Sequence, residues 1–495
     1  MFITGMLTVG AFLLIARAAT RQEKSPVMML TGIAVLALSV VGHTLTFTSP
    51  YAAVTALTAE FGIGLVLVAG FLARKKMPAR PFFYLGSLSL IACVLLIGIG
   101  RFVRSDLDVR HNTTLLVELG PDDHIEELTD LLAQFDAQYE RAFPNISLRM
   151  DEDLSQVFIV SVADRRVKNL IRALTADAEN VDNVELNRTI GLEEPIITNT
   201  VDFDAEAVLE NDPLVKEQWS LQAIKGHEAH AYLKDLTPAR KARVAIVDTG
   251  VDASHEDISS VFTTSPGSAD VHGHGSHCAG IAGAATNNGL GIASLNWEGR
   301  FIEVTGYKAL NDQGMGTIES IAQAILDASR ADADVISMSL GSKSPTAPKT
   351  IVDAVEFAQR NDAIVIVSAG NSNEDAINHM PSNIPGVIVV SAVDENLRKA
   401  SFSNINTSLA RPIAAPGVNI LSLRTRGGYV RMSGTSMSTP VVSGLVGVMR
   451  SLNPDLSAEN AYKILNDTGL DIQDSARVGR LINAAEAIET VHSGN

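Results

Sequence analysis

Four short apolar runs in the C-terminal half of the chain constrain its fold more than any other feature. They are rich in Val, Ile and Ala, and they are ARVAIVD (242–248), DVISMSL (334–340), AIVIVSA (363–369) and VIVVSAV (387–393). Helical patterns lie between and after them, at 277–285, 316–330, 350–360, 436–451 and 457–466. Apolar strands that alternate with helices are typical of a parallel sheet buried on both faces. We therefore predict an α/β fold with a doubly wound parallel sheet over residues 213–495.

The first hundred residues differ in composition from the rest of the chain. Four apolar segments fill them, at about 2–19, 27–48, 51–73 and 82–100. The last three each offer about 20 largely apolar residues, enough to cross the hydrocarbon of a bilayer. The first is shorter, but it lacks the basic leader and the small-residue cleavage site of a secretory signal. Residues 1–104 are therefore predicted to form a four-helix transmembrane anchor in the lipid bilayer.

Basic residues in two of the predicted loops orient this anchor. They are Arg17, Arg21 and Lys24 after the first segment, and Arg74, Lys75, Lys76 and Arg80 after the third. Positively charged loops stay in the cytoplasm, so both ends of the anchor are expected outside. We thus predict an integral, multi-pass membrane protein whose remaining domains are extracytoplasmic, either periplasmic or extracellular.

A small α+β domain is predicted over residues 105–191. Its expected strands are TTLLVEL (113–119), ISLRM (146–150), QVFIVSV (156–162) and a last one near 184–186, and its expected helices are 122–143 and 165–175. The order βαββαβ is typical of a ferredoxin-like sandwich. The following residues, 192–212, are rich in Asp, Glu and Thr and are predicted to be a linker.

Charge and cysteine content limit the classes of partner. The chain has 39 Lys and Arg against 56 Asp and Glu, a net charge of −17 at pH 7. Nucleic-acid binding needs clustered basic side chains at the phosphates, so nucleic acid is not expected as a partner. The two cysteines, Cys93 and Cys278, offer no disulfide framework, and Cys278 is expected to be a packing residue.

Three polar side chains stand at the ends of apolar elements, where α/β folds place their sites. Asp248 ends the first strand, and Ser436 begins an apolar helix. His274 lies between Gly273 and Gly275, just before another helix. Each position also has an ordinary explanation, because Asp after a strand is often a turn residue and Ser at a helix start is often an N-cap. Taken singly, none of them assigns an activity.

A zinc site is an alternative interpretation of the histidines. His272, His274 and His277 are close in sequence, but no matching carboxylate or cysteine cluster accompanies them. The sequence HEAH at 227–230 is one residue short of the spacing found in zinc proteases. Metal ligands therefore remain unknown from the sequence.

Together with two further segments, the three polar residues resemble the subtilisin-like serine proteases, or subtilases. The matching segments are VDTGVD (247–252), HGSHCAG (274–280), SLG (339–341), SAGN (368–371) and GTSMSTP (434–440). The order Asp, then His, then Ser is the order of this family. The resemblance implies that Asp248, His274 and Ser436 form a catalytic triad, and that Asn371 helps to stabilise the oxyanion.

The resemblance also implies how a polypeptide substrate binds. An extended peptide would be added as a strand between two segments, which supply Gly314 on one side and Ser339, Leu340 and Gly341 on the other. A side-chain pocket is expected between residues 371 and 381. Glu374 and Asp375 lie in that stretch, and they would either attract a basic side chain or simply be solvated.

Two further expectations come from the family. The α+β domain looks like its inhibitory propeptide, which would make this domain a partner of the catalytic domain, with self-cleavage in the linker 192–212. Asp257 matches a family calcium ligand, but the loop at 286–294 looks shorter than the calcium-binding loop of secreted subtilisins, which leaves a structural calcium in doubt. The chemistry itself requires no cofactor.

The sequence thus predicts a membrane-anchored serine endopeptidase, made as a zymogen, that cleaves extended polypeptides through an acyl-enzyme. Two other classes stay open. One is a catalytically silent subtilase fold that serves as a binding scaffold. The other is a sensor protease that acts on a neighbouring membrane protein.

Overall fold

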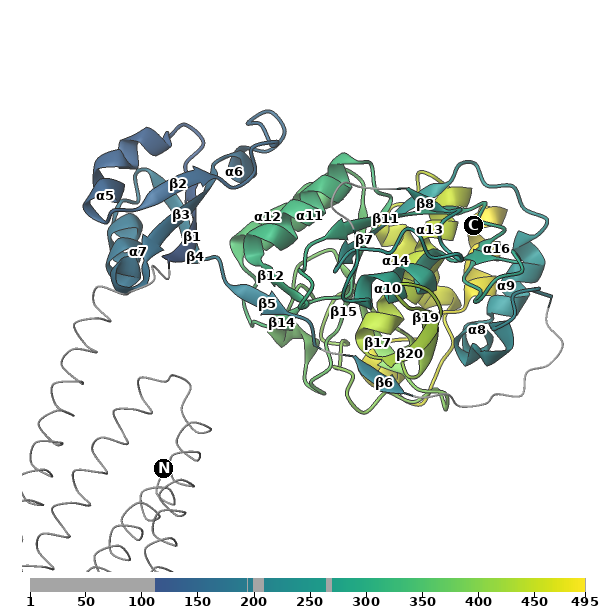
Figure 1. Ribbon diagram of the computed structural model, residues 1–495. Coiled ribbons are helices and arrows are strands. Elements are labelled where there is room, and N and C mark those ends of the chain that lie inside the picture. The colour runs from purple at the N-terminus through teal and green to yellow at the C-terminus, as the bar shows by residue number, and fades with distance from the viewer. Residues whose placement is uncertain (1–111, 194, 199–208, 264–268, 495) are drawn as a thin grey trace, which may run out of the picture. The chain divides into compact units, whose positions relative to one another are not determined.

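The computed structural model describes residues 112–193, 195–198, 209–263 and 269–494 (Figure 1). They belong to the second of two compact units into which the chain divides, Met1–His111 and Asn112–Asn495. The four segments predicted to span a membrane, within residues 1–104, lie outside the described residues.

The predicted membrane localisation is contradicted by the helices of the described residues. Within the described ranges, no helix combines the length and the apolar character that crossing a bilayer requires. The longest helix described there, α13 (Thr435–Leu452), has 18 residues and contains several hydroxyl side chains and Arg450. This finding contradicts the expectation of an integral, multi-pass membrane protein with an extracytoplasmic catalytic domain.

A seven-stranded sheet forms the centre of the α/β domain (Figure 1). Its strands stand in the order β18-β17-β15-β13-β7-β11-β8, and all neighbours pair in parallel. They are β7 (Ala242–Asp248), β8 (Phe262–Thr263), β11 (Ile302–Lys308), β13 (Val335–Met338), β15 (Ile364–Ser368), β17 (Ile388–Val393) and β18 (Pro412–Pro416). The four apolar runs of the sequence are β7, β13, β15 and β17, so the predicted parallel sheet is confirmed.

Helices cover both faces of this sheet, as its alternating side chains require. Along β7, Val244 and Ile246 join one buried apolar cluster, whereas Ala245 and Val247 join another. Helices of the first cluster are α9 (Gly226–Leu233), α10 (His274–Gly283), α13, α14 (Ala458–Thr468) and α16 (Ala484–Ser493). Those of the second are α11 (Ile318–Arg330) and α12 (Lys349–Arg360), which lie side by side in Figure 1. The doubly wound arrangement is therefore confirmed.

The domain that precedes this sheet contains four antiparallel strands in the order β2-β3-β1-β4. Its elements are β1 (Asn112–Leu119), η1 (Ile125–Leu128), α5 (Thr129–Gln134), β2 (Gln138–Arg141), α6 (Glu152–Ser155), β3 (Val157–Ala163), α7 (Val167–Ala176) and β4 (Val181–Leu186). Apart from the short α6, the chain order is βαββαβ, as a ferredoxin-like sandwich requires.

Two elements of this domain differ from the sequence prediction. The helix expected over 122–143 ends at Gln134, because Asp136 adopts a left-handed conformation with φ of 54° and residues 138–141 continue as β2. The segment expected as a strand at 146–150 forms turns instead, because β2 already occupies the sheet edge beside β3.

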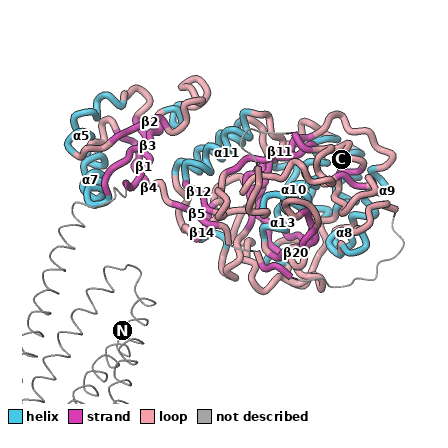
Figure 2. The backbone as a smooth tube through the Cα atoms, in the orientation of Figure 1, coloured by secondary structure: helices cyan, strands magenta, loops and turns pink. Residues whose placement is uncertain are grey.

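Short strands connect this domain to the α/β domain. β5 (Thr189–Gly191) pairs antiparallel with β12 (Met315–Thr317), as Figure 2 shows, and β6 (Ile196–Thr198) pairs antiparallel with β20 (Tyr429–Ser433). β20 also pairs with β19 (Ile420–Leu423). β5 and β6 therefore pair with two different segments of the α/β domain, and the second of these, β20, leads into α13.

Candidate active site

The carboxyl end of β7 and the start of α10 bring an aspartate and a histidine together. His274 Nδ1 lies 2.8 and 2.9 Å from the two carboxylate oxygens of Asp248, and both side chains are fully buried. Asp248 also accepts a hydrogen bond from the backbone N–H of Thr249 at 2.7 Å. A carboxylate at Nδ1 keeps the proton on that nitrogen and leaves Nε2 to act as a base.

Glycines on both sides of the histidine allow this close approach. Gly273 precedes α10 with φ of 102°, a left-handed conformation that glycine adopts without strain. At Gly275, a Cβ atom would lie 2.0 Å from the carbonyl oxygen of Gly250. The helix can therefore begin against the loop after β7 only because both positions lack a side chain.

Ser436 lies in the first turn of α13. Its hydroxyl donates to the carbonyl oxygen of Ser339 at 3.2 Å. His274 Nε2 is buried, and within the described part of the chain it has no hydrogen-bond partner. The structure thus does not contain the hydrogen bond between Ser436 and His274 that the resemblance implies. Such bonds are often loose before substrate binds, and rotation about the serine Cα–Cβ bond moves the hydroxyl.

Cys278 packs between the histidine and the serine helix. Its Sγ lies 4.0 Å from His274 Nδ1, and it donates to the carbonyl oxygen of Ser436 at 3.4 Å. Burial raises the pKa of the Cys278 thiol, so the sulfur stays protonated. His274 and Ser436 therefore flank one sulfur atom, and Cys278 serves as the packing residue that we expected.

The charge state of His274 is set by two opposing effects. Burial disfavours the imidazolium, but the adjacent Asp248 carboxylate outweighs it, so the pKa of His274 is raised well above its usual value. A base must be neutral to accept a proton, so this site is competent only at the pH at which the imidazolium has lost its proton.

Asn371 follows β15 and is held by the start of α13. Its Oδ1 accepts hydrogen bonds from the backbone N–H and the hydroxyl of Thr435, both at 2.9 Å. A Cβ atom built on Gly434 would lie 3.6 Å from Asn371 Nδ2 and 3.7 Å from the backbone nitrogen of Ser436. Two N–H donors therefore lie beside one point at the start of α13, an arrangement suited to stabilising an oxyanion.

A cavity beside these donors contains most of the residues expected to contact substrate. Its lining consists of residues 339–342, 368–371, 379–380 and 435–436, together with Glu193. Ser339, Leu340 and Gly341 are thus brought next to Ser436. Gly314 is not among the lining residues; it directly precedes β12, and its carbonyl oxygen accepts from the backbone N–H of Leu192 at 2.9 Å.

The chain itself occupies the place expected for an extended substrate. β5 pairs with β12, and Glu193 then enters the cavity, where its carboxylate accepts from the Asn371 backbone N–H at 2.5 Å and from the Ser372 hydroxyl at 3.4 Å. Sequence reasoning missed Glu193. The available signal was its position near the start of the segment in which self-cleavage was expected.

The two acidic residues considered for the pocket do not line it. Glu374 pairs with Lys343 at 2.5 Å, and Asp375 caps the short helix at 376–378 and accepts from Ser408. His379 lines the cavity instead, with only 3% of its side chain exposed. Its Nε2 lies 3.7 Å from Glu374 and makes no hydrogen bond within the described residues. The pocket thus offers a histidine rather than free carboxylates.

The histidines considered for zinc at 272–277 are used otherwise. His277 Nε2 donates to the carbonyl oxygens of Ile420 and Val430, both at 3.1 Å, which joins α10 to β19 and β20. Burial lowers the pKa of His277 to about 3, so its ring is neutral. Nδ1 of His274 and Nε2 of His277 are thus already paired, with Asp248 and with two backbone carbonyls respectively.

The chain is similar in sequence and fold to several known proteins. The sequence profile of the Subtilase family matches residues 239–481. Thermitase of Thermoactinomyces vulgaris is 33% identical over 290 residues, which cover 56% of this chain and 99% of thermitase. A thermophilic serine proteinase of Bacillus sp. (strain AK1) is 38% identical over 228 residues, or 44% of this chain and 55% of that protein. Fervidolysin from Fervidobacterium pennivorans shares the fold, with a TM-score of 0.62 at 21% identity over 77% of this chain and 61% of fervidolysin.

Proposed function

The chain belongs to the subtilase family, and from this membership we propose that it is a serine endopeptidase that hydrolyses extended polypeptides through an acyl-enzyme. The observation that carries the proposal is the buried contact between His274 and Asp248, with Ser436 and Asn371 lining the cavity that contains Glu193. Desolvating such a pair is costly, and a general base beside a nucleophile is one function that offsets this cost.

Each side chain has a defined part in this chemistry. Ser436 Oγ attacks the carbonyl carbon of the scissile bond while its proton passes to His274 Nε2, and Asp248 stabilises the imidazolium. Asn371 Nδ2 and the Ser436 backbone N–H donate to the oxyanion. His274 then protonates the leaving amine. Water, deprotonated by His274 in the same way, hydrolyses the acyl-enzyme and restores the serine.

Labelling with a fluorophosphonate probe tests this function against the silent scaffold. The probe is expected to modify Ser436 in the wild-type protein and to abolish peptide hydrolysis in proportion to labelling, because only an activated hydroxyl reacts. The modified residue is identified by mass spectrometry. A folded protein that takes up no probe and cleaves no peptide would favour the scaffold.

The α+β domain is proposed to be an inhibitory propeptide. Glu185 accepts hydrogen bonds from the backbone N–H groups of Lys349 and Thr350, at 3.0 and 3.1 Å, at the start of α12. Asn187 Oδ1 accepts from the N–H of Glu319 at 3.1 Å, at the start of α11. Polar groups of the domain thus cap two helix N-termini, which favours docking. The docked domain directs β5 into the substrate cleft.

Self-processing is proposed at the peptide bond that follows Glu193. β5 pairs with the catalytic domain upstream of this bond and β6 pairs with β20 downstream of it. β20 ends at Ser433, three residues before Ser436, and Glu193 lines the same cavity as Ser436. Glu193 would then be the residue before the scissile bond, and its side chain lies in the cavity that selects that residue.

We expect the enzyme to prefer glutamate before the scissile bond. The pocket supplies the Asn371 N–H, the Ser372 hydroxyl and the buried His379, all able to donate to a carboxylate. Peptides that differ only at this position should show kcat/KM at least about 10-fold higher for Glu than for Lys. Sequencing the processed protein should give a new N-terminus at residue 194, and Glu193→Lys should slow its formation more than Glu193→Gln. An N-terminus elsewhere, or a preference for Lys, would contradict the assignment.

A structural calcium ion is compatible with the loop that holds Asp257, although no chemical step needs it. Asp257 accepts from Asn288 Nδ2 at 3.0 Å and from the Ile292 N–H at 2.8 Å. Burial, with a contribution from the charge of Asp212, raises the pKa of Asp257 to about 6. Buried carboxylates of like charge beside one loop are oxygen donors of the kind that calcium binds. Asp212 and Asp257 would hold the ion.

A further inference from the structure

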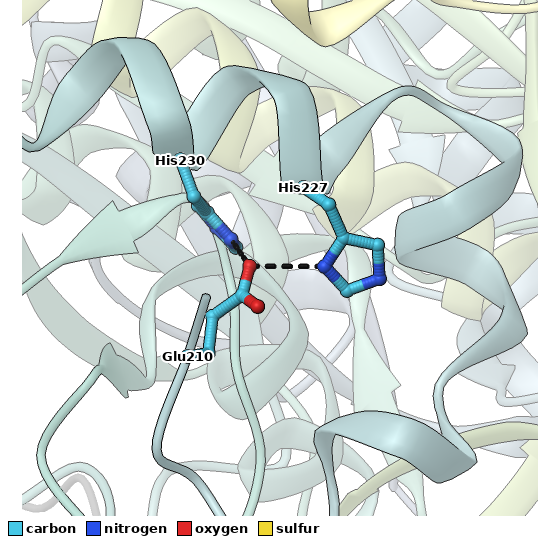
Figure 3. A group of neighbouring side chains, drawn as sticks. All are labelled: Glu210, His227 and His230. Carbon is cyan, nitrogen blue, oxygen red and sulfur yellow. Dashed lines mark hydrogen bonds and ion pairs between the residues drawn. The ribbon is translucent and has the colours of Figure 1, made fainter. Parts of the chain in front are cut away.

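A second group of ionisable side chains lies where α9 contacts the chain segment around residue 210. None of these side chains belongs to the triad. His227 and His230 stand three residues apart on α9, and Glu210 reaches them from that segment (Figure 3). One ligand atom from each residue lies within 4.8 Å of the other two. The side chains of Glu210 and His230 are fully buried, and that of His227 is 25% exposed.

The hydrogen bond on the far side of His230 fixes its tautomer. His230 Nε2 lies 2.6 Å from the carbonyl oxygen of Ser294. A carbonyl oxygen can only accept, so the proton is on Nε2 and the neutral ring has a bare Nδ1. That Nδ1 contacts Oε1 of Glu210, which is also an acceptor. Two lone pairs would therefore face each other in a buried site unless a proton or a metal ion lies between them.

Glu210 has more acceptor capacity than its neighbours use. Its Oε1 contacts both His230 Nδ1 and His227 Nδ1, the latter at 2.9 Å, as Figure 3 shows. Its Oε2 is buried and makes no hydrogen bond to any described residue. Buried carboxylate oxygens are normally paired, so an oxygen left over beside two imidazoles points to a bound cation.

We propose that Glu210, His227 and His230 bind a divalent transition-metal ion of the zinc class through the carboxylate and the two Nδ1 atoms. Imidazole donors suit zinc, whereas calcium takes oxygen ligands. Donation from the second ring nitrogen to a backbone carbonyl, as His230 makes to Ser294, is the usual support of a ligating histidine. A water molecule would be the fourth ligand, as in zinc sites with three protein ligands. The two histidines of HEAH lie about one helical turn apart on α9. Glu210, which lies outside this helix, would supply the third protein ligand.

The position of the ion gives it a structural role. Glu210 lies two residues before Asp212, which accepts from the backbone N–H groups of Asn287 and Asn288 at 2.7 and 3.0 Å. A metal ion bound by Glu210 and the histidines would therefore crosslink the start of the catalytic domain to α9. This crosslink lies two residues before Asp212, which contacts the loop that contains Asn287 and Asn288. Cleavage after Glu193 would leave this segment near a new chain end, where an added crosslink has most to stabilise.

Zinc titration of the full-length Ser436→Ala protein tests the site without self-cleavage. After treatment with a chelator, the protein is titrated with Zn²⁺ in a calorimeter, and its Tm is measured with and without the ion. The same is done with His227→Ala added, and with His124→Ala added as a matched control, because His124 is an exposed histidine away from this cluster. Any background binding, including that of Asp248, His274 and Cys278, is common to all three proteins.

The parent and the His124→Ala control are expected to bind one more zinc ion than the His227→Ala protein. Saturating zinc should raise Tm by about 5 °C or more in these two alone. Co²⁺ in place of Zn²⁺ should give visible absorption bands that His227→Ala removes. Equal zinc stoichiometry in all three proteins would overturn the proposal, and the pair would then be held by a proton as an imidazolium and a carboxylate. Should His227→Ala fail to fold, Glu210→Gln provides the same comparison.

Discussion

Replacing Ser436 with alanine is expected to lower kcat for peptide hydrolysis by about 10⁶-fold, the size of loss measured for the nucleophile of subtilisin. The hydroxyl is the attacking atom, and its neighbours cannot supply another, because the Ser438 hydroxyl donates to the carbonyl oxygen of Ala415 at 3.1 Å. Self-processing uses the same atom, so the variant should also remain a single full-length chain. The rate of hydrolysis of a chromogenic peptide measures the loss of activity. Migration of the protein in a denaturing gel shows whether the chain has been cut.

Ser438→Ala provides the matched control for this experiment. It removes a hydroxyl from the same turn of α13 without touching the cavity, so activity should stay within a few-fold of the wild type. A Ser436→Ala protein that hydrolyses peptides at the wild-type rate would rule out the proposed nucleophile. A Ser436→Ala chain that is still cut after Glu193, but hydrolyses nothing, would assign processing to another protease and leave the activity intact.

The elements that could be predicted are those in which one pattern of apolar residues extends over the whole helix or strand. The apolar run 242–248 coincides with β7, because a strand buried on both faces needs continuous apolar side chains. The resemblance to the subtilases implied that Asp248 and His274 lie together, and the structure contains a contact between their side chains. The contact between these two side chains then follows from where β7 ends and α10 begins.

Other features depend on contacts that no local pattern encodes. β5 and β6 have three residues each, and they are strands because β12 and β20 offer them unpaired edges. Residues 122–143 read as one helix, yet the left-handed Asp136 ends it early. Glu210 and the two histidines lie 17 and 20 residues apart, and only the packing of α9 brings them together. Sequence spacing is a poor guide when the partner comes from a loop.

Asp248→Asn is expected to lower kcat by about 10⁴-fold while leaving Ser436 and Asn371 in place, a magnitude taken from the same Asp-to-Asn change in another serine protease. Asp248 accepts at both oxygens from His274 Nδ1 and from the Thr249 N–H. An amide in its place would turn an N–H toward the imidazole and favour the tautomer with its proton on Nε2. That nitrogen could no longer take the proton of Ser436.

The pH profile of Asp248→Asn separates this role from a general loss of structure. In the wild type, the carboxylate raises the pKa of His274, so kcat/KM should fall as pH drops, with a midpoint above 6.5. Without that charge, burial dominates and the pKa falls, so the acid limb of the residual activity should move to lower pH. Asp252→Asn is the control, because its carboxylate contacts Ser254 and the Arg426 N–H instead. Removing the charge of a carboxylate that lies 2.8 Å from an imidazole must lower the pKa of that imidazole. An acid limb at the same pH in Asp248→Asn and wild type would therefore show that Asp248 does not set the pKa of His274.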